Sequence, residues 1–324
     1  MKKIIIFFIF IAVLFGINGC RRNRNTANND KINVITTIFA SYDFVRQIAG
    51  DKVNLTMLLP PGAESHSFEP SPRDIINIQN SDVFVYIGGE SDRWVDHILQ
   101  SMNTENMNIL SLLETVEILE EEIIEGMEGF HDHDHDDDLD DDGHEHDEIE
   151  YDEHVWTSPR NAILIVNAIT DLLSKADPAN ADYFKQNAAA YIVQLQDLDK
   201  TFKDIAGGAK RKTLVFGDRF PFRYFVHEYN LDYFAAFPGC STETEPSAAT
   251  VAFLINKIKH EQIPVVFHIE LSNERMADTI SSETGAKKLM LHSCHNVAKR
   301  DFDAGLTYLD FMQRNSENLR EALY

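Results

Sequence analysis

Residues 31–60 read KINVITTIFASYDFVRQIAGDKVNLTMLLP and set the fold class that we predict for the chain. KINVITTIFA and VNLTMLLP are short apolar runs rich in β-branched residues, which is typical of buried strands. Between them, SYDFVRQIAGDK has helical spacing and a glycine near its end, which indicates a helix stop. The order strand, helix, strand is the unit from which parallel sheets are built.

The same alternation continues along the first half of the chain. We predict strands in DVFVYIGG and NILSL and helices in SPRDIINIQNS and SDRWVDHILQSM. Ser71 is expected to cap the first of these helices, with Pro72 at its first position. A further helix begins at Ser158-Pro159 and ends near residue 177. These elements form one α/β lobe.

A second lobe follows one long helix. ANADYFKQNAAAYIVQLQDLDKTFKDIAGG keeps helical periodicity without an internal glycine or proline until its end. Beyond it, TLVFGD, IPVVFHIE and LMLHSC are predicted strands, and the predicted helices are FPFRYFVHEY, SAATVAFLINKIKHE, SNERMADTISSETG and FDAGLTYLDFMQRNSENLREAL. The predicted fold class is α/β: two lobes, each a parallel sheet flanked by helices, joined by one long rigid helix. The predicted bounds are 33–178 for the N-terminal lobe, 179–206 for the linking helix and 207–324 for the C-terminal lobe. A cleft between two such lobes is a common place for ligands.

The N-terminus has the layout of an export signal. MKKIIIFFIFIAVLFGINGC (residues 1–20) combines a basic pair, an apolar run and a small residue directly before Cys20. It resembles a bacterial lipoprotein signal, in which Cys20 becomes the lipidated N-terminus and residues 21–32 form a tether. The alternative is a transmembrane anchor, but an apolar run of about 15 residues is short of the roughly 20 that a span requires. We therefore expect an exported protein on the bacterial envelope, in the periplasm or on the outer face of the cell membrane.

An acidic, histidine-rich tract interrupts the first lobe. The net charge of the chain is −24, and residues 131–153 hold 14 carboxylates and no lysine or arginine, which leaves a net charge of −10 for the remainder. No basic stripe is present that would suit nucleic acid. We expect a disordered loop over about 120–152, because from His131 on Leu139 is the single aliphatic side chain before Ile149. The tract either collects metal ions or is a solvated linker.

Three motifs give the chain a resemblance to a known family. PPGAESHSFEPSPRD precedes the tract, and HVWTSPRNA and GLTYLDFM follow it. With the lipoprotein signal, this order resembles the zinc- and manganese-binding lipoproteins of ABC importers, the ZnuA/TroA-like family. The resemblance implies two four-stranded lobes, a rigid linking helix and a metal ion bound between the lobes. It also implies delivery of the ion to a membrane permease, and we expect a monomer that contacts the membrane through its lipid anchor.

Two histidines match the family's metal ligands in the first lobe. His66 follows a Pro-Pro-Gly turn at the C-terminal end of a predicted strand, where open α/β sheets place ligands, although it could instead cap the next helix. His154 matches the second metal histidine of the family in HVWTSP. Imidazole suits Zn²⁺, and these two side chains would form half of a site that the other lobe completes.

The second lobe departs from the family pattern. Zinc-type relatives have a histidine after the strand that matches TLVFGD, and manganese-type relatives have a glutamate near there. No histidine is available here, and Asp218 is the nearest group with ligand chemistry. The family's fourth ligand, a carboxylate, follows the last strand, where this chain has His292, with His295 three residues on. Glu270, at the end of VVFHIE, is held as a spare ligand. Three histidines and one carboxylate would suit tetrahedral zinc, whereas an oxygen-rich set would favour manganese.

The tract itself supports zinc over manganese through the same resemblance. Its histidines would hold Zn²⁺ weakly at several places as auxiliary ligands: His131, His133, His135, His144 and His146. The remaining cysteines, Cys240 and Cys294, are expected to form one disulfide, because exported cysteines rarely stay reduced.

Two other function classes compete with metal capture for import. A metal-dependent hydrolase would keep an open metal position beside a general base, and Glu270 could serve, but the chain has no HExxH motif, no nucleophile elbow and no phosphate-binding glycine loop. A surface adhesin is the second alternative, since lipoproteins of this family have been described in that role. We do not expect an enzyme.

Overall fold

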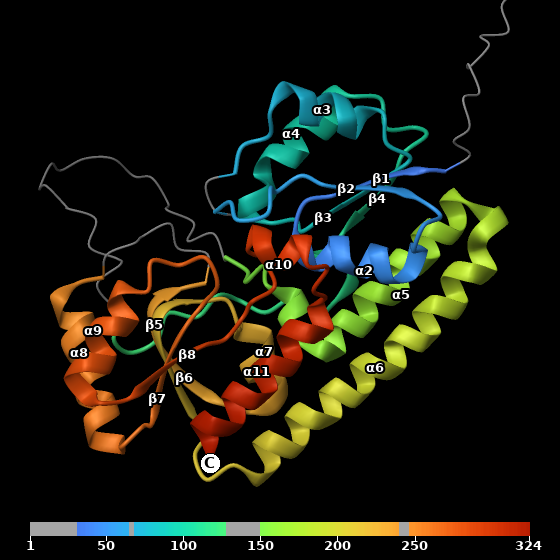
Figure 1. Cartoon of the computed structure of the whole chain (residues 1–324). Helices are drawn as coiled ribbons and strands as arrows, with labels where there is room; N and C mark the ends of the chain where they lie inside the picture. Colours follow the sequence, from blue (N-terminus) through green and yellow to red (C-terminus); the bar gives the residue numbers. More distant parts are fainter. Residues whose placement is uncertain (1–30, 65–67, 128–149, 240–245) are drawn as a thin grey trace, which may run out of the picture. The chain divides into compact units, whose positions relative to one another are not determined.

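Two four-stranded parallel sheets are the framework of the computed structural model, which describes residues 31–64, 68–127, 150–239 and 246–324 (Figure 1). The first sheet has the order β2-β1-β3-β4, with β1 at Asn33–Thr36, β2 at Asn54–Met57, β3 at Val83–Tyr86 and β4 at Asn108–Ser111. The second has the order β6-β5-β7-β8, with β5 at Thr213–Phe220, β6 at Asp232–Pro238, β7 at Val265–His268 and β8 at Lys287–Met290. All strand pairs in these sheets are parallel, which confirms the predicted fold class.

Helices cover both faces of the first sheet because its strands are apolar on both sides. The helices are α2 (Phe39–Ala49), α3 (Pro72–Gln79), α4 (Arg93–Ser101) and α5 (Pro159–Ala176). Ile35 and Phe84 point toward α3 and α4, whereas Val34 and Val83 belong to the core shared with α2 and α5. Ser71 caps α3 with a capping box and Ser158 caps α5, as predicted from their Ser-Pro pairs.

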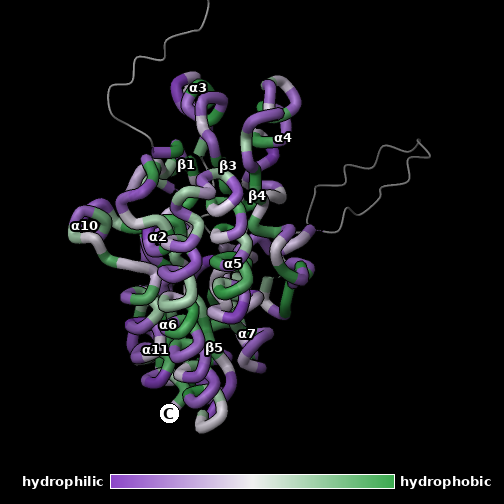
Figure 2. The backbone as a smooth tube through the Cα atoms, turned by 90° about the vertical axis from the view of Figure 1, so that its right-hand side faces the viewer, coloured by the Kyte–Doolittle hydropathy of each residue, from purple (hydrophilic) through white to green (hydrophobic). Residues whose placement is uncertain are grey.

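The second sheet is covered in the same way. Its helices are α7 (Arg223–Tyr229), α8 (Ala248–Glu261), α9 (Arg275–Thr284) and α11 (Tyr308–Leu323). The short helix α10 (Lys299–Asp303) lies beside α2 of the first lobe, where Phe302 packs on Tyr42 (Figure 1). Val215 and Val266 pack with α8 and α9, whereas Phe216 and Phe267 face the larger core with α7 and α11. Figure 2 shows hydrophobic stretches along α5 in the interior, whereas the short surface helix α10 is largely hydrophilic.

One long helix, α6 (Ala181–Gly208), runs beside both sheets (Figure 1). Its 28 residues span about 42 Å at 1.5 Å per residue. It packs on α2 and α5 of the first lobe and on α7 and α11 of the second. The buried Phe184, Tyr191, Leu195, Leu198 and Phe202 form its apolar stripe, so the same core joins the two lobes.

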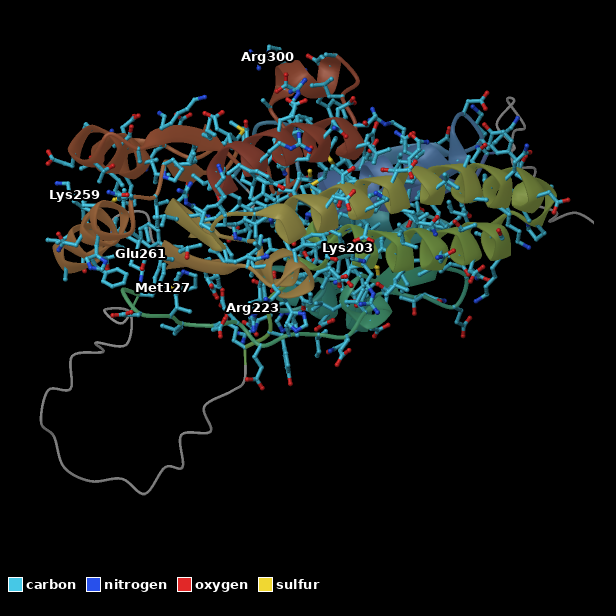
Figure 3. The ribbon with its side chains drawn as sticks, turned by 90° about the horizontal axis from the view of Figure 1, so that it is seen from below. Met127, Lys203, Arg223, Lys259, Glu261 and Arg300 are labelled. Carbon is cyan, nitrogen blue, oxygen red and sulfur yellow. The ribbon has the colours of Figure 1, made fainter. Side chains whose placement is uncertain are left out.

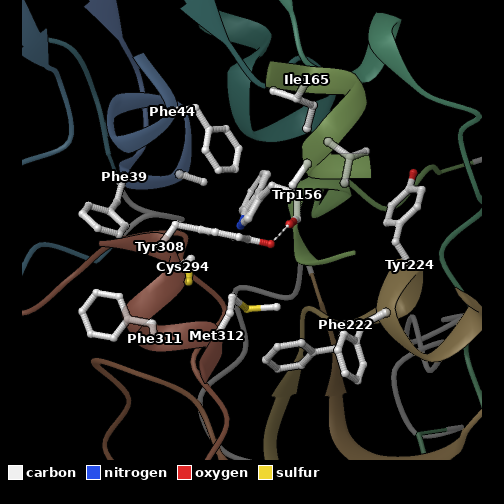
Figure 4. Packing of buried hydrophobic residues seen from close by; sticks show 14 of the residues in the cluster. Phe39, Phe44, Trp156, Ile165, Phe222, Tyr224, Cys294, Tyr308, Phe311 and Met312 are labelled. Carbon is white, nitrogen blue, oxygen red and sulfur yellow. Dashed lines mark hydrogen bonds between the residues drawn. The ribbon is translucent and has the colours of Figure 1, made fainter. Parts of the chain in front are cut away.

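The centre of this shared core lies beside the site described below. Trp156 and Tyr308 are fully buried there, and the Tyr308 hydroxyl donates a 2.8 Å hydrogen bond to the Trp156 carbonyl (Figure 4). The Phe44 ring packs edge-on against Tyr308 with 5.0 Å between ring centroids. The segments that approach the site are therefore backed by rigid aromatic packing rather than by solvent.

Two elements differ from the sequence prediction. The strand β6 was not located from the sequence, and the predicted single C-terminal helix is two helices. The break lies at Gly305, whose φ of +74° lies in the left-handed region, and Thr307 then starts α11 with a capping box to Asp310. The predicted signal peptide and Cys20 lie outside the described residues. Among the described residues, no helix is both long and apolar enough for a membrane span.

Candidate metal-binding site

A small cavity of about 30 Å³ lies between segments of the two lobes. It is lined by Ala63, Glu64, His154, Arg219, Pro221, Gly239, Ile269, Glu270, Leu271, Ser272, Ser293, His295 and Asn296. Pockets for organic ligands usually measure about 300–1,000 Å³, whereas a single water needs only about 10–15 Å³ measured in this way. The cavity therefore has the size for an ion and is too small for a sugar or a peptide.

His154 reaches the cavity from the turn that precedes α5. It is 1% exposed, its backbone N–H donates to Asp152 Oδ1 at 2.8 Å, and its Nδ1 lies 3.3 Å from the same oxygen. A carboxylate beside one ring nitrogen orients a metal-binding imidazole and fixes its tautomer. Burial acts to lower the pKa of His154, but the Asp152 carboxylate acts against it and the pKa lies above its ordinary value of 6.5.

His295 reaches the cavity from the loop that follows β8. Its ring centroid lies 5.5 Å from that of His154, and both rings contact Trp156. The loop is fixed to the first lobe, because the His295 carbonyl accepts the Phe39 N–H at 3.0 Å. The structure thus brings together two imidazoles that are far apart in the sequence.

Glu270 supplies a carboxylate to the same cavity. Its Oε2 accepts the Ser293 N–H at 2.7 Å and its Oε1 accepts the Ser293 hydroxyl at 2.5 Å. Ser293 Oγ in turn accepts the His295 N–H at 3.2 Å, so the carboxylate and His295 are held in one network. Each carboxylate oxygen has a second lone pair, so these bonds leave acceptor capacity for a metal ion.

Asp218, the predicted third ligand, is used differently. Its Oδ1 accepts the Arg219 N–H at 2.9 Å and its Oδ2 accepts the Ile269 N–H at 3.1 Å. Burial raises the pKa of this carboxyl. Asp218 does not line the cavity and instead joins the ends of β5 and β7. It positions the cavity wall and lines a neighbouring pocket with Glu64 and Arg219, and its role as a metal ligand stays a prediction.

His292, the predicted fourth ligand, also points elsewhere. Its ring stacks on Phe311 with 4.0 Å between centroids, and its Nδ1 accepts the Cys294 N–H at 3.0 Å. Burial lowers the pKa of His292, although the Glu270 carboxylate, whose Oε1 lies 3.7 Å from Nδ1, acts in the other direction. The chain turns at Cys294, whose φ is +62°, and this turn brings His295 rather than His292 to the cavity.

Several predicted residues fall outside the described ranges. They are His66, the tract histidines His131, His133, His135, His144 and His146, and Cys240. Within the described ranges, no three His, Cys, Asp or Glu side chains are grouped closely enough to hold a metal ion by themselves. The predicted disulfide finds no support, because Cys294 is a free, fully buried thiol whose pKa is raised well above its usual value by burial.

The sequence reasoning missed Asp152 and the role of the turn at Cys294. Asp152 is separated from His154 by one residue, and a carboxylate beside a candidate metal histidine is a usable signal. Nothing in the local sequence indicates that His295 rather than His292 reaches the cavity. Their different directions follow from contacts of this loop with distant residues.

Comparison with known proteins gives a consistent result. The family described as "Zinc-uptake complex component A periplasmic" matches residues 34–322. The chain is 35% identical over 306 residues to the high-affinity zinc uptake system protein ZnuA of Bacillus subtilis, a match that covers 94% of this chain and 92% of that protein. It is 33% identical to the zinc-binding lipoprotein AdcA of Streptococcus pneumoniae over 99% of this chain, which corresponds to 61% of AdcA. The crystal structure of the Zn(II)-bound ZnuA-like domain of AdcA matches with a TM-score of 0.72 and 31% identity, covering 90% of this chain and 99% of that domain.

Proposed function

Because the chain belongs to the family of zinc-uptake complex component A, we propose that it is the solute-binding protein of an ABC importer. It captures zinc outside the cytoplasm and delivers the ion to a membrane permease. The family consists of binding proteins rather than enzymes, and the predicted resemblance is confirmed by the family match. The chain covers 61% of AdcA, and it matches the crystal structure of the Zn(II)-bound ZnuA-like domain of that protein over 99% of the domain.

The cavity is the observation that carries this proposal. In a space of about 30 Å³ it contains the imidazoles of His154 and His295 and the carboxylate of Glu270, beside a second carboxylate, Glu64, that is paired with Arg219. Nitrogen donors from histidine with one carboxylate are a usual ligand set for zinc. We propose His66 as the remaining ligand, since its motif matches the family's first metal histidine. Manganese is not favoured, because it prefers oxygen-rich sites.

The proposal also includes a lipid anchor, a monomeric state and a role for the histidine-rich tract. Lipidation of Cys20 would anchor the protein to the envelope as a monomer, with residues 21–32 as a tether. The five tract histidines would bind further zinc ions weakly and raise the local concentration of the ion near the cavity. Acidic side chains around them would favour any divalent cation.

Zinc titration of the purified protein tests the proposal. We expect one tight zinc site by calorimetry with metal content verified by mass spectrometry, together with weaker sites from the tract. His154→Ala should weaken the tight site by a factor of about a hundred or more, since a four-coordinate site loses one of its ligands. His97→Ala is the matched control, because His97 is an exposed histidine on α4. Equal zinc affinity of the two variants would reject the site.

A further inference from the structure

An ion pair joins the two sides of the cavity. Arg219 Nη1 donates to Glu64 Oε1 at 3.0 Å, and both residues line the cavity beside His154 and His295. Glu64 lies in the segment after β2, whereas Arg219 lies in β5 of the other lobe. The Arg219 side chain is 13% exposed and that of Glu64 is 42% exposed, so the pair extends from the cavity toward solvent.

The residues directly before Glu64 are held to the loop after β8 by a different kind of contact. The Gly62 N–H donates to the Val297 carbonyl at 2.8 Å, and the Asn296 side-chain amide donates to the carbonyls of Pro60 and Ala63 at 2.9 and 2.8 Å. Several bonds with backbone groups must break together for residues 60–63 to separate from this loop. A single half-exposed ion pair breaks much more readily.

Arg219 is held at the cavity by Asp218. The Asp218 carboxylate bonds the backbone N–H groups of Arg219 and Ile269, so the end of β5 is fixed to the residue that follows β7. The backbone at Arg219 is therefore fixed at the edge of a site for a cation, and an unpaired guanidinium there would repel the ion. Glu64 neutralises that charge and connects it to the first lobe.

We propose that the Glu64–Arg219 ion pair is a latch that slows the release of the metal ion from the cavity. The proposal rests on the proposed function, in which this cavity binds zinc. A latch and a purely electrostatic role predict opposite changes in the rate of zinc release when Arg219 is replaced by glutamine. Loss of the Arg219 charge alone would strengthen the attraction for Zn²⁺ and slow release, whereas loss of the latch speeds it.

Stopped-flow transfer of zinc from the protein, loaded with one equivalent, to an excess of fluorescent chelator measures the release rate. We expect Arg219→Gln and Glu64→Gln each to speed release by about 1.5-fold to fivefold, the range expected for a half-exposed ion pair. The double variant, whose net charge equals that of the wild type, should release zinc no faster than the single variants, because the same contact is lost.

Lys203→Gln is the charge control, since Lys203 lies on α6 and pairs with Asp199 and Glu228 (Figure 3). Thermal unfolding verifies that each variant is folded. If Arg219→Gln does not fold, Glu64→Gln still removes the ion pair, and it changes an exposed side chain. Release from Arg219→Gln at the wild-type rate or slower, or effects that multiply in the double variant, would overturn the latch. A wild-type protein without a tight zinc site would instead overturn the proposed function.

Discussion

The two histidines of the cavity are held in place in different ways. His154 is fixed by its sequence neighbours, with Asp152 at 3.3 Å from its ring and the Trp156 ring centroid at 5.5 Å. His295 is fixed by residues far away in the chain, including the Phe39 N–H on its carbonyl. A ligand on a locally determined turn can be recognised from a motif, whereas a ligand on a loop held by distant partners cannot.

The loop around His295 shows how many distant partners are involved. The Trp156 indole N–H donates to the Ser293 carbonyl at 2.8 Å. Asn315 on α11 accepts the His292 N–H and donates to the His292 carbonyl, both at 2.8 Å. Together these bonds fix which side chains of LHSCHN face the cavity and which face the core.

The largest expected effect is the difference in zinc affinity between the alanine variants of His295 and His292. His295→Ala should weaken tight zinc binding by a factor of about a hundred or more, because it removes a ligand. His292→Ala should change zinc affinity by less than about tenfold but lower the free energy of unfolding by about 1–3 kcal/mol, because it removes a buried ring from Phe311. Calorimetry and thermal unfolding of both variants measure this difference. The reverse pattern would restore His292 as the ligand.

A smaller effect distinguishes the two carboxylates of the second lobe. Glu270→Gln should weaken zinc binding by about tenfold to a hundredfold, since the cavity loses the carboxylate that is not paired with Arg219 and keeps a similar shape. Asp218→Asn should have a lesser effect on zinc affinity, because Asp218 does not line the cavity and its carboxylate accepts the backbone N–H groups of Arg219 and Ile269. Calorimetric titration of the two variants provides the measurement. A greater loss of affinity in Asp218→Asn would contradict the cavity that we describe.

The smallest expected effect concerns the pH dependence that Asp152 gives to His154. Zinc binding requires a neutral ring, and Asp152 holds the pKa of His154 above 6.5. Zinc affinity should therefore fall as the pH drops through the His154 pKa, by about tenfold for each pH unit per imidazole. Asp152→Asn removes the cause that raises this pKa, so the fall should begin at a lower pH. Zinc titrations between pH 5 and 8 measure the onset, and an identical onset in both proteins would exclude this coupling.

The elements that sequence reasoning placed well are those with local signals. The Ser-Pro pairs at residues 71–72 and 158–159 predicted the starts of α3 and α5, since a serine cap and a first-turn proline act within one helical turn. The long helix was predicted at 179–206 and is observed at Ala181–Gly208, because 28 residues without a central break leave few alternatives.

The elements that were missed depend on their surroundings. The strand β6 follows α7 without a glycine or proline between them, and the helix ends at Asn230 in the left-handed region with φ +50°. The aromatic-rich run Asp232–Pro238 forms a strand because it pairs with β5. Gly305 divides the C-terminal helix although the apolar spacing continues across it.

The sequence by itself determined the α/β class, the two lobes with their long linking helix, and His154 in its motif, because propensity, caps and spacing act over a few residues. Only the tertiary structure decided that His295 and Glu270 line the cavity while His292 and Asp218 stay outside it. The physical reason is that a loop has no periodicity of its own to fix the direction of its side chains. Its direction comes from hydrogen bonds to Phe39, Trp156 and Asn315, which lie 20 or more residues away in the chain.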